Sequence, residues 1–159
     1  MSRKRFINPE GLSKPPGYTH VVEVAAPGRI VSLAGQLGVD AGGRLVGAPG
    51  DFRAQATQTY ENLKTALAAV GAQFSDVVKF NNYLVDTTYL PVFREVRDSY
   101  LADQNRPAST TIAISGLARE GALLEIEAVA VLPAAAARKA ARKGAGKRSA
   151  TKAARRKGR

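Results

Sequence analysis

Cysteine is absent from this 159-residue chain, and histidine occurs once, as His20. The absence of cysteine excludes disulfide bonds, thiolate metal sites and a cysteine nucleophile. A single histidine excludes a zinc site built mainly from imidazole groups. No apolar run approaches the ~20 residues that a membrane span requires. The basic N-terminus is not followed by an apolar segment, so we expect no signal peptide and predict a soluble cytoplasmic protein.

Basic residues are concentrated at the C-terminus. The chain has 24 Lys and Arg against 13 Asp and Glu, which gives a formal net charge of +11. Residues 134–159 contain no acidic residue and eleven basic ones: Arg138, Lys139, Arg142, Lys143, Lys147, Arg148, Lys152, Arg155, Arg156, Lys157 and Arg159. Residues 1–133 are therefore neutral overall. We expect one domain over 1–133 and a basic tail over 134–159.

The tail contains no aromatic and no large aliphatic side chain. It cannot bury enough apolar area to offset the entropy of ordering, so we expect it to be disordered. Its composition resembles the tails of histone-like nucleoid-associated proteins, which implies sequence-independent, salt-sensitive binding of DNA or RNA and a nucleoid-associated location. The alternatives are a tail that only increases solubility and weaker contact with an anionic membrane.

Strand-like and helix-like patterns alternate within 1–133. Apolar residues predict strands over 18–24, 29–34, 77–85, 110–114 and 122–132, with Pro27-Gly28 as the turn between the first two. A helix is expected after Asp51, a residue suited to an N-cap, and is expected to end at Gly71. A second helix is expected near Pro91. This order, β-β-α-β-α-β-β, predicts an α+β two-layer fold with two helices on one face of a mixed sheet.

Two carboxylates share one face of the last predicted strand. Glu125 and Glu127 are separated by one residue, which places them roughly 7 Å apart on that face. Carboxylates in this arrangement could perform acid–base chemistry, or they could belong to a solvated sheet face. The other face is apolar and is expected to be buried: Leu124, Ile126, Ala128 and Ala130.

Several cationic side chains could bind an anion. Arg94 and Arg97 lie one turn apart on the second predicted helix and could clamp a carboxylate, although such pairs are also typical of a solvated helix surface. Arg106 precedes Pro107 in a predicted loop. His20 could act as a base, or it could be a hydrogen-bonding residue of a strand. The sequence has no glycine-rich phosphate loop.

Motifs throughout the domain share their order and spacing with one family. They are NPEGLSKPPGYTHVVEV at 8–24, Ala34-Gly35-Gln36, Gln55, Asn62-Leu63, DVVKFNNYLVD at 76–86, Arg-Pro-Ala-Ser-Thr at 106–110 and LEIEAVAVL at 124–132. Over about residues 6–132 the chain resembles the Rid (YjgF-like) family of reactive-intermediate deaminases. The resemblance implies a chorismate-mutase-like fold and a homotrimer with ligand clefts between subunits. It also implies hydrolysis of enamines and imines without a metal or cofactor.

The resemblance assigns roles to several residues. Glu125 matches the family glutamate that orients or activates the attacking water, and Tyr18 matches a tyrosine that lines the cleft. Ala34 stands where the family commonly has the serine of a Ser-Gly-Gln motif, and Arg94 stands where the deaminases often have asparagine. We therefore expect Tyr18, Ala34 and Arg94 to lie at the ligand site.

One family residue is missing. The arginine of the family's Pro-Ala-Arg motif, which binds the substrate carboxylate, is replaced here by Ser109. A serine offers one neutral hydroxyl in place of two convergent charged donors, a loss on the order of 2–5 kcal/mol in a desolvated site. Arg94, Arg97 or Arg106 could supply the missing charge for a carboxylate-bearing ligand. The alternative is a trimer that binds a metabolite without turnover and is tethered to nucleic acid by its tail.

Overall fold

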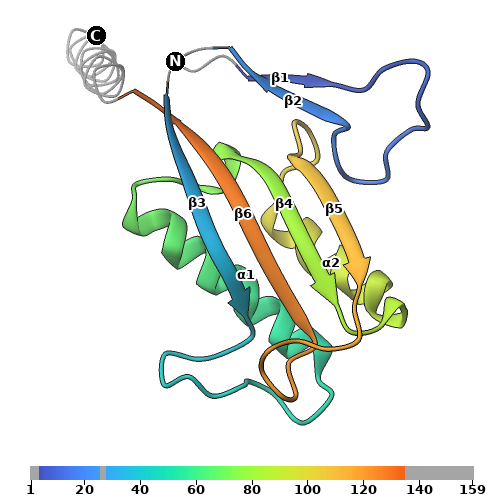
Figure 1. Ribbon diagram of the computed structural model, residues 1–159, viewed down its shortest axis with the longest axis vertical. Coiled ribbons are helices and arrows are strands. Elements are labelled where there is room, and N and C mark those ends of the chain that lie inside the picture. The colour runs from blue at the N-terminus through green and yellow to red at the C-terminus, as the bar shows by residue number, and fades with distance from the viewer. Residues whose placement is uncertain (1–3, 26–27, 135–159) are drawn as a thin grey trace, which may run out of the picture.

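The computed structural model describes residues 4–25 and 28–134 (Figure 1). The predictions made for the basic residues of the tail and for Pro27 of the predicted turn lie outside the described residues. The described elements follow the order β1 (Lys4–Ile7), β2 (Val21–Val24), β3 (Gly28–Leu37), α1 (Phe52–Ala69), η1 (Phe74–Asp76), β4 (Val77–Leu84), η2 (Thr87–Tyr89), α2 (Leu90–Tyr100), β5 (Ala108–Ala113) and β6 (Leu124–Pro133).

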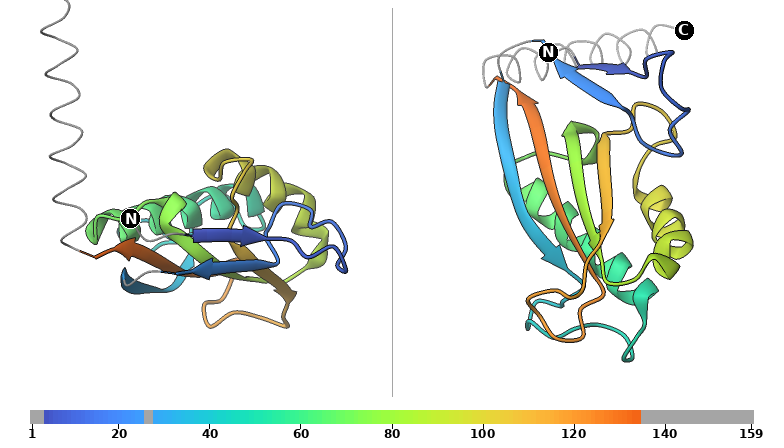
Figure 2. Two further views of the ribbon diagram at one scale, coloured as in Figure 1. Left: turned by 90° about the horizontal axis from the view of Figure 1, so that it is seen from above. Right: turned by 45° about the vertical axis from the view of Figure 1, so that its right-hand side comes forward.

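Four of the strands form a mixed sheet in the order β3-β6-β4-β5. β6 pairs antiparallel with both β3 and β4, and β4 pairs parallel with β5. Helices α1 and α2 lie on one face of this sheet, and no helix of the described residues covers the other face (Figure 2). The predicted α+β architecture is therefore confirmed.

The pairing of the first predicted strands is wrong. β2 begins at Val21 rather than at residue 18, and it pairs antiparallel with β1, a strand that the sequence patterns did not indicate. Phe6 lies opposite Val22, and the Arg5 Nη1 atom donates to Glu23 Oε2 at 2.7 Å. β3 pairs with β6 instead. A four-residue strand is too short to give a periodic pattern, which explains why β1 was missed.

Helix α1 is specified by its cap and its apolar stripe. The Asp51 carboxylate accepts a hydrogen bond from the Ala54 N–H at 2.9 Å, as an N-cap does. One face is buried in the core: Phe52, Ala56, Tyr60, Leu63 and Leu67. Gly71 follows the C-cap residue Val70 with a φ of +69°, so the predicted end of the helix is confirmed.

Helix α2 has Pro91 in its first turn, as expected, and it buries Phe93 and Val96. Arg97 departs from its predicted surroundings. Only 9% of this residue is exposed, so the interpretation of Arg94 and Arg97 as a solvated pair is wrong for Arg97. Arg94 remains exposed.

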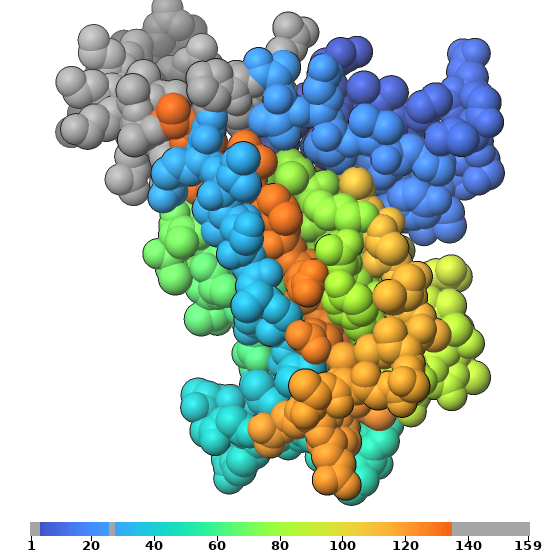
Figure 3. Space-filling view, in the orientation of Figure 1, coloured from blue at the N-terminus to red at the C-terminus, as the bar shows by residue number. Residues whose placement is uncertain are grey.

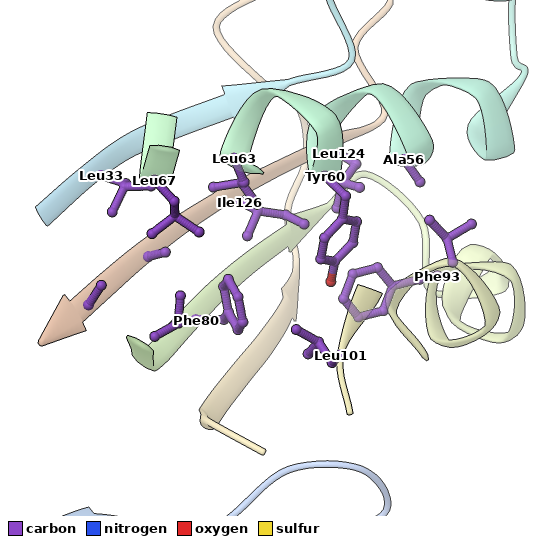
Figure 4. Close-up of a cluster of buried hydrophobic side chains, with 14 of the residues drawn as sticks. Leu33, Ala56, Tyr60, Leu63, Leu67, Phe80, Phe93, Leu101, Leu124 and Ile126 are labelled. Carbon is purple, nitrogen blue, oxygen red and sulfur yellow. The ribbon is translucent and has the colours of Figure 1, made fainter. Parts of the chain in front are cut away.

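The core fills the space between the helices and the sheet (Figure 4). The apolar face of β6 is buried, as its alternation predicts. The ring of Tyr60 stacks on that of Tyr100 at a centroid distance of 5.0 Å, and its hydroxyl is buried without a hydrogen-bond partner among the described residues. Burial raises the pKa of Tyr60 above its ordinary range.

Candidate functional site

A cavity of about 260 Å³ opens between the N-terminal loop, α2 and β5. Its lining contains Tyr18, Arg94 and Ser109, three of the residues that the resemblance assigned to the ligand site. Arg97 also lines it, together with four other residues: Pro16, Leu90, Phe93 and Thr111. An adjoining groove of about 550 Å³ shares four of these residues: Pro16, Tyr18, Arg94 and Arg97. The structure thus brings together cationic, aromatic and hydroxyl groups from segments far apart in sequence.

Ser109 is held in the cavity wall by Asn82. The Asn82 Nδ2 atom donates to Ser109 Oγ at 3.0 Å and also lies within hydrogen-bond distance of the Thr110 carbonyl and of Thr111 Oγ1. Since Ser109 Oγ accepts from Asn82, its own hydrogen is free to be donated to a ligand. The Asn82 Oδ1 atom is buried without a partner among the described residues.

Sequence reasoning missed Asn82. It lies between Phe80 and Leu84 on the buried side of β4, and only 2% of it is exposed. A buried polar group needs hydrogen bonds, so an amide at an apolar position of an alternating strand was the signal that could have identified it.

The three arginines are used differently. Arg106 lies in the wall of the larger groove and donates to Asp98 Oδ1 at 2.5 Å, to the Ala102 carbonyl at 3.1 Å and to Asp103 Oδ1 at 3.3 Å. The Nε atom of Arg97 donates to Asp98 Oδ1 at 2.8 Å. Arg94 has no hydrogen-bond or ion-pair partner among the described residues. Arg94 and Arg97 therefore retain donors for a ligand, whereas Arg106 is committed to the chain itself.

Asp98 organises this cluster. Burial opposes the ionisation of its carboxyl, but hydrogen bonds from Arg97 and Arg106 outweigh burial and hold the pKa of Asp98 below its ordinary value of 3.8. The carboxylate is therefore charged at neutral pH and fixes the position of both guanidinium groups.

The loop that carries Tyr18 is tied to the segment before β5. Thr19 Oγ1 donates to the Arg106 carbonyl at 2.6 Å, and the Thr19 N–H donates to the Pro107 carbonyl at 3.2 Å. The Tyr18 ring packs edge-on against His20, with centroids 5.3 Å apart. The His20 Nε2 atom lies 2.8 Å from the Ser13 carbonyl, which supports a hydrogen-bonding role for this histidine, although it lies just before β2 and not in a strand.

Glu125 lies elsewhere, on the face of the sheet that points away from the helices. We call this surface the open face; it comprises the outward side chains Ile30, Lys79, Asn81, Tyr83, Thr110, Ile112, Glu125 and Glu127. Figure 3 views it directly. A Cβ on Gly35 would lie 1.8 Å from Glu125 Oε1, so the carboxylate rests on the bare backbone of Gly35. Ala34, the neighbouring residue, is exposed.

Glu127 has partners of its own on the open face. Its Oε2 atom accepts from Asn81 Nδ2 and from the Tyr83 hydroxyl, each at 3.3 Å. Desolvation, followed by the charge of Glu127, raises the pKa of Tyr83. Glu125 and Ser109 face opposite sides of one sheet, and within a single chain the structure does not bring them together.

Comparisons with known proteins place the chain in a family. Residues 12–132 match the family described as endoribonuclease L-PSP. A RutC family protein of Pyrococcus horikoshii is 33% identical over 80% of this chain and 97% of its own length. The chain belongs to the Rid (YjgF-like) family. Another Rid relative, the 2-iminobutanoate/2-iminopropanoate deaminase of Dermatophagoides farinae, is 32% identical over 83% of this chain and 99% of its own length.

The fold of this Rid protein agrees with solved structures. A conserved Rid family protein of unknown function from Yersinia pestis is 36% identical, with a TM-score of 0.72 over 81% of this chain and 98% of that one. The RidA protein of an Antarctic Psychrobacter gives a TM-score of 0.61 at 32% identity, over 80% and 99% of the two chains. Among the described residues, no helix is both long and apolar enough to cross a membrane.

Proposed function

We propose that this Rid protein hydrolyses a small enamine or imine that carries a carboxylate. The observation that supports this proposal most is the cavity in which Tyr18, Ser109 and two available guanidinium groups converge. Its position between α2 and β5 leaves it open to small molecules. Relatives named 2-iminobutanoate/2-iminopropanoate deaminase support the choice of substrate class.

In the proposed step, Glu125 accepts a proton from water as the water oxygen attacks the imine carbon. Glu125 passes this proton to the nitrogen, which gives a tetrahedral carbinolamine. The hydroxyl proton of the carbinolamine moves to the amino group as the carbon–nitrogen bond breaks, so that ammonia leaves and a ketone remains. Hydrolysis of an imine in this way consumes one water and needs no oxidant or reductant. The absence of a side chain at Gly35 lets the Glu125 carboxylate lie against the backbone of β3 on the open face, because a Cβ there would overlap Oε1.

The proposed site is shared between subunits of a homotrimer. Glu125 lies on the open face and Ser109 lies on the helix side, so a cleft that uses both residues needs a second copy of the chain. Two large apolar side chains on the open face support such contact, because Ile30 is 74% exposed and Ile112 is 46% exposed. Apolar groups at this exposure favour burial against another subunit.

The experiment measures ammonia release from enzymatically generated 2-aminoacrylate and 2-iminopropionate. We expect the wild-type protein to accelerate release and Glu125→Gln to lower kcat on the order of 10²- to 10⁴-fold, since it removes the proton acceptor. Glu127→Gln is the matched control, because Glu127 is a carboxylate of the same strand and face with partners of its own. Ser109→Arg should raise activity toward these monocarboxylates.

Two results would overturn the proposal. One is wild-type protein that releases ammonia no faster than buffer, and the other is Glu125→Gln with the wild-type rate. An inactive wild type combined with an active Ser109→Arg variant would instead support the alternative function, a trimer that binds a metabolite without turnover.

The composition of the tail supports a second proposal. We propose that residues 134–159, with eleven basic and no acidic side chains, bind DNA or RNA by neutralising phosphates. Full-length protein should retain duplex DNA at low salt and release it as salt rises. A protein truncated after residue 133 should lose retention and keep its fold. Retention by the truncated protein would contradict this proposal.

A further inference from the structure

Helix α2 presents two guanidinium groups to the cavity at the place where strand β5 offers only a hydroxyl. Arg94 and Arg97 both line the cavity, beside Ser109. They are separated by one turn, which places the Cβ atoms of an (i, i+3) pair ~5–6 Å apart. In this chain the positive charge at the cavity therefore comes from the helix and not from strand β5.

Arg97 is built as a fixed anchor. It is 9% exposed, and its Nε atom donates to Asp98 at 2.8 Å. Its Nη1 and Nη2 atoms have no hydrogen-bond acceptor among the described residues. Because the guanidinium is planar and its Nε is already held, the remaining donors are pre-oriented for a carboxylate.

Gly17 allows the N-terminal loop to close over Arg97. A Cβ on Gly17 would lie 2.4 Å from Arg97 Nη2 and 2.9 Å from Arg106 Nη1. Its φ of +94° also disfavours any residue with a side chain. The backbone at Gly17 thus packs directly on the Arg97 guanidinium and narrows the cavity on the side of the N-terminal loop.

The charges around the groove do not cancel. Its lining contains four basic residues, Lys14, Arg94, Arg97 and Arg106, and two acidic ones, Asp98 and Asp103, which leaves two positive charges. Both acidic side chains are occupied by Arg106, and Asp98 also holds Arg97. Arg94 is exposed, has no partner among the described residues and lies at the junction of the cavity and the groove.

We propose that Arg97 and Arg94 bind the two acidic groups of one ligand, so that the protein selects small dicarboxylates over monocarboxylates. Arg97 binds the carboxylate beside Ser109, and Arg94 binds the second carboxylate nearer the solvent. A cavity of about 260 Å³ limits the ligand to a short chain. This inference rests on the proposed function, because it places the substrate in the same cavity.

The test measures the binding of two acids of equal chain length, 2-oxoglutarate and 2-oxopentanoate, by titration calorimetry at fixed ionic strength. Full-length wild-type protein should bind 2-oxoglutarate at least ~tenfold more tightly, since the second carboxylate adds a charge-assisted contact. Arg97→Met should weaken binding of both acids by ~30-fold or more. Arg94→Met should weaken only 2-oxoglutarate, by ~tenfold, and so make the two affinities similar.

Two further variants separate anchoring from general effects. Arg53→Met removes an exposed arginine of α1 that pairs with Glu95, and it should leave both affinities within ~twofold of wild type. Gly17→Ala displaces the Arg97 guanidinium without changing the charge of the site, and it should weaken the binding of both acids. Because Arg94 is exposed, its variant is expected to fold even if Arg97→Met does not.

Equal affinity of the wild type for the two acids would overturn the proposal, and so would an Arg94→Met variant that keeps the wild-type preference. Its failure is distinguishable from failure of the proposed function. Ammonia release that depends on Glu125 but not on Arg97 would support the hydrolase and contradict the role of Arg97. Selective binding of 2-oxoglutarate without ammonia release would support dicarboxylate binding and contradict the hydrolase.

Discussion

The two faces of the four-stranded sheet differ in the side chains that they carry and in how far these are buried. The helix side is apolar and covered by α1 and α2, and it buries few polar side chains, among them Asn82, which donates to Ser109. The open face carries Glu125 and Glu127 together with large exposed apolar residues such as Ile30. A single chain thus completes its own core but leaves one surface that combines charge with uncovered apolar area.

This difference separates the requirements of folding from those of chemistry. The hydrophobic core lies on the helix side of the sheet. The carboxylate proposed to act on water lies on the open face, whereas the cationic cavity lies at the rim of the helix side. Substitutions on the two faces should therefore have different effects.

The largest expected effect on stability is in the core. Leu63 is fully buried on the inner face of α1, so Leu63→Ala should lower the free energy of unfolding by about 2–5 kcal/mol. Glu125→Gln on the open face should change it by less than ~0.5 kcal/mol. Chemical denaturation of both variants measures this contrast. Comparable losses would mean that the open face also supports the fold.

Gln55 should show an intermediate effect, because it links helix α1 to the turn before β6. Its side chain donates to the Gly121 carbonyl at 3.0 Å and accepts from the Leu123 N–H at 2.9 Å, and only 2% of it is exposed. Gln55→Ala leaves both backbone groups without this partner and should cost about 1–3 kcal/mol. Thr65→Ala, at an exposed position of α1, is the control, with a change near zero.

The smallest effect, at Asp98, depends on pH. A folded-state pKa below 3.8 means that the Asp98 carboxylate adds stability above that pH, and that this contribution is lost as pH falls through the lower folded value. Asp98→Asn should therefore destabilise the protein at pH 7, by up to ~1 kcal/mol because the side chain is 44% exposed. Thermal unfolding should show the difference from wild type shrinking below about pH 4. A constant difference would argue against this ion-pair cluster.

Local patterns carried enough information to predict most of the architecture. Asp51 and Gly71 gave the two ends of α1, and the alternation in 124–132 gave the buried face of β6. The partner of β2 could not be predicted in this way, because strand pairing depends on contacts distant in sequence. Two family motif residues, Gln55 and Asn62, do not line the cavity. Gln55 donates to the Gly121 carbonyl, and Asn62 donates to backbone carbonyls at the end of β3 and just after it.

The candidate site was predictable only as a set of residues. The resemblance assigned Tyr18, Arg94 and Ser109 to a ligand site, and the structure places all three around one cavity. The burial of Arg97 could not be read from the sequence, because it arises from the packing of the loop at Gly17. Alternation predicted the face on which Glu125 lies, whereas the placement of Ser109 on the other face depends on the pairing of β4 with β5.

The shared cleft is tested most directly by subunit complementation between two variants that are each expected to be inactive. Glu125→Gln lacks the proposed proton acceptor, and Ser109→Trp fills the cavity. If each cleft takes these residues from different subunits, refolding the two variants together at equal amounts should restore imine hydrolysis to ~a quarter of the wild-type rate, the fraction of clefts with both residues intact. Mixed trimers that stay inactive would show that both residues serve one chain's site and would contradict the shared cleft.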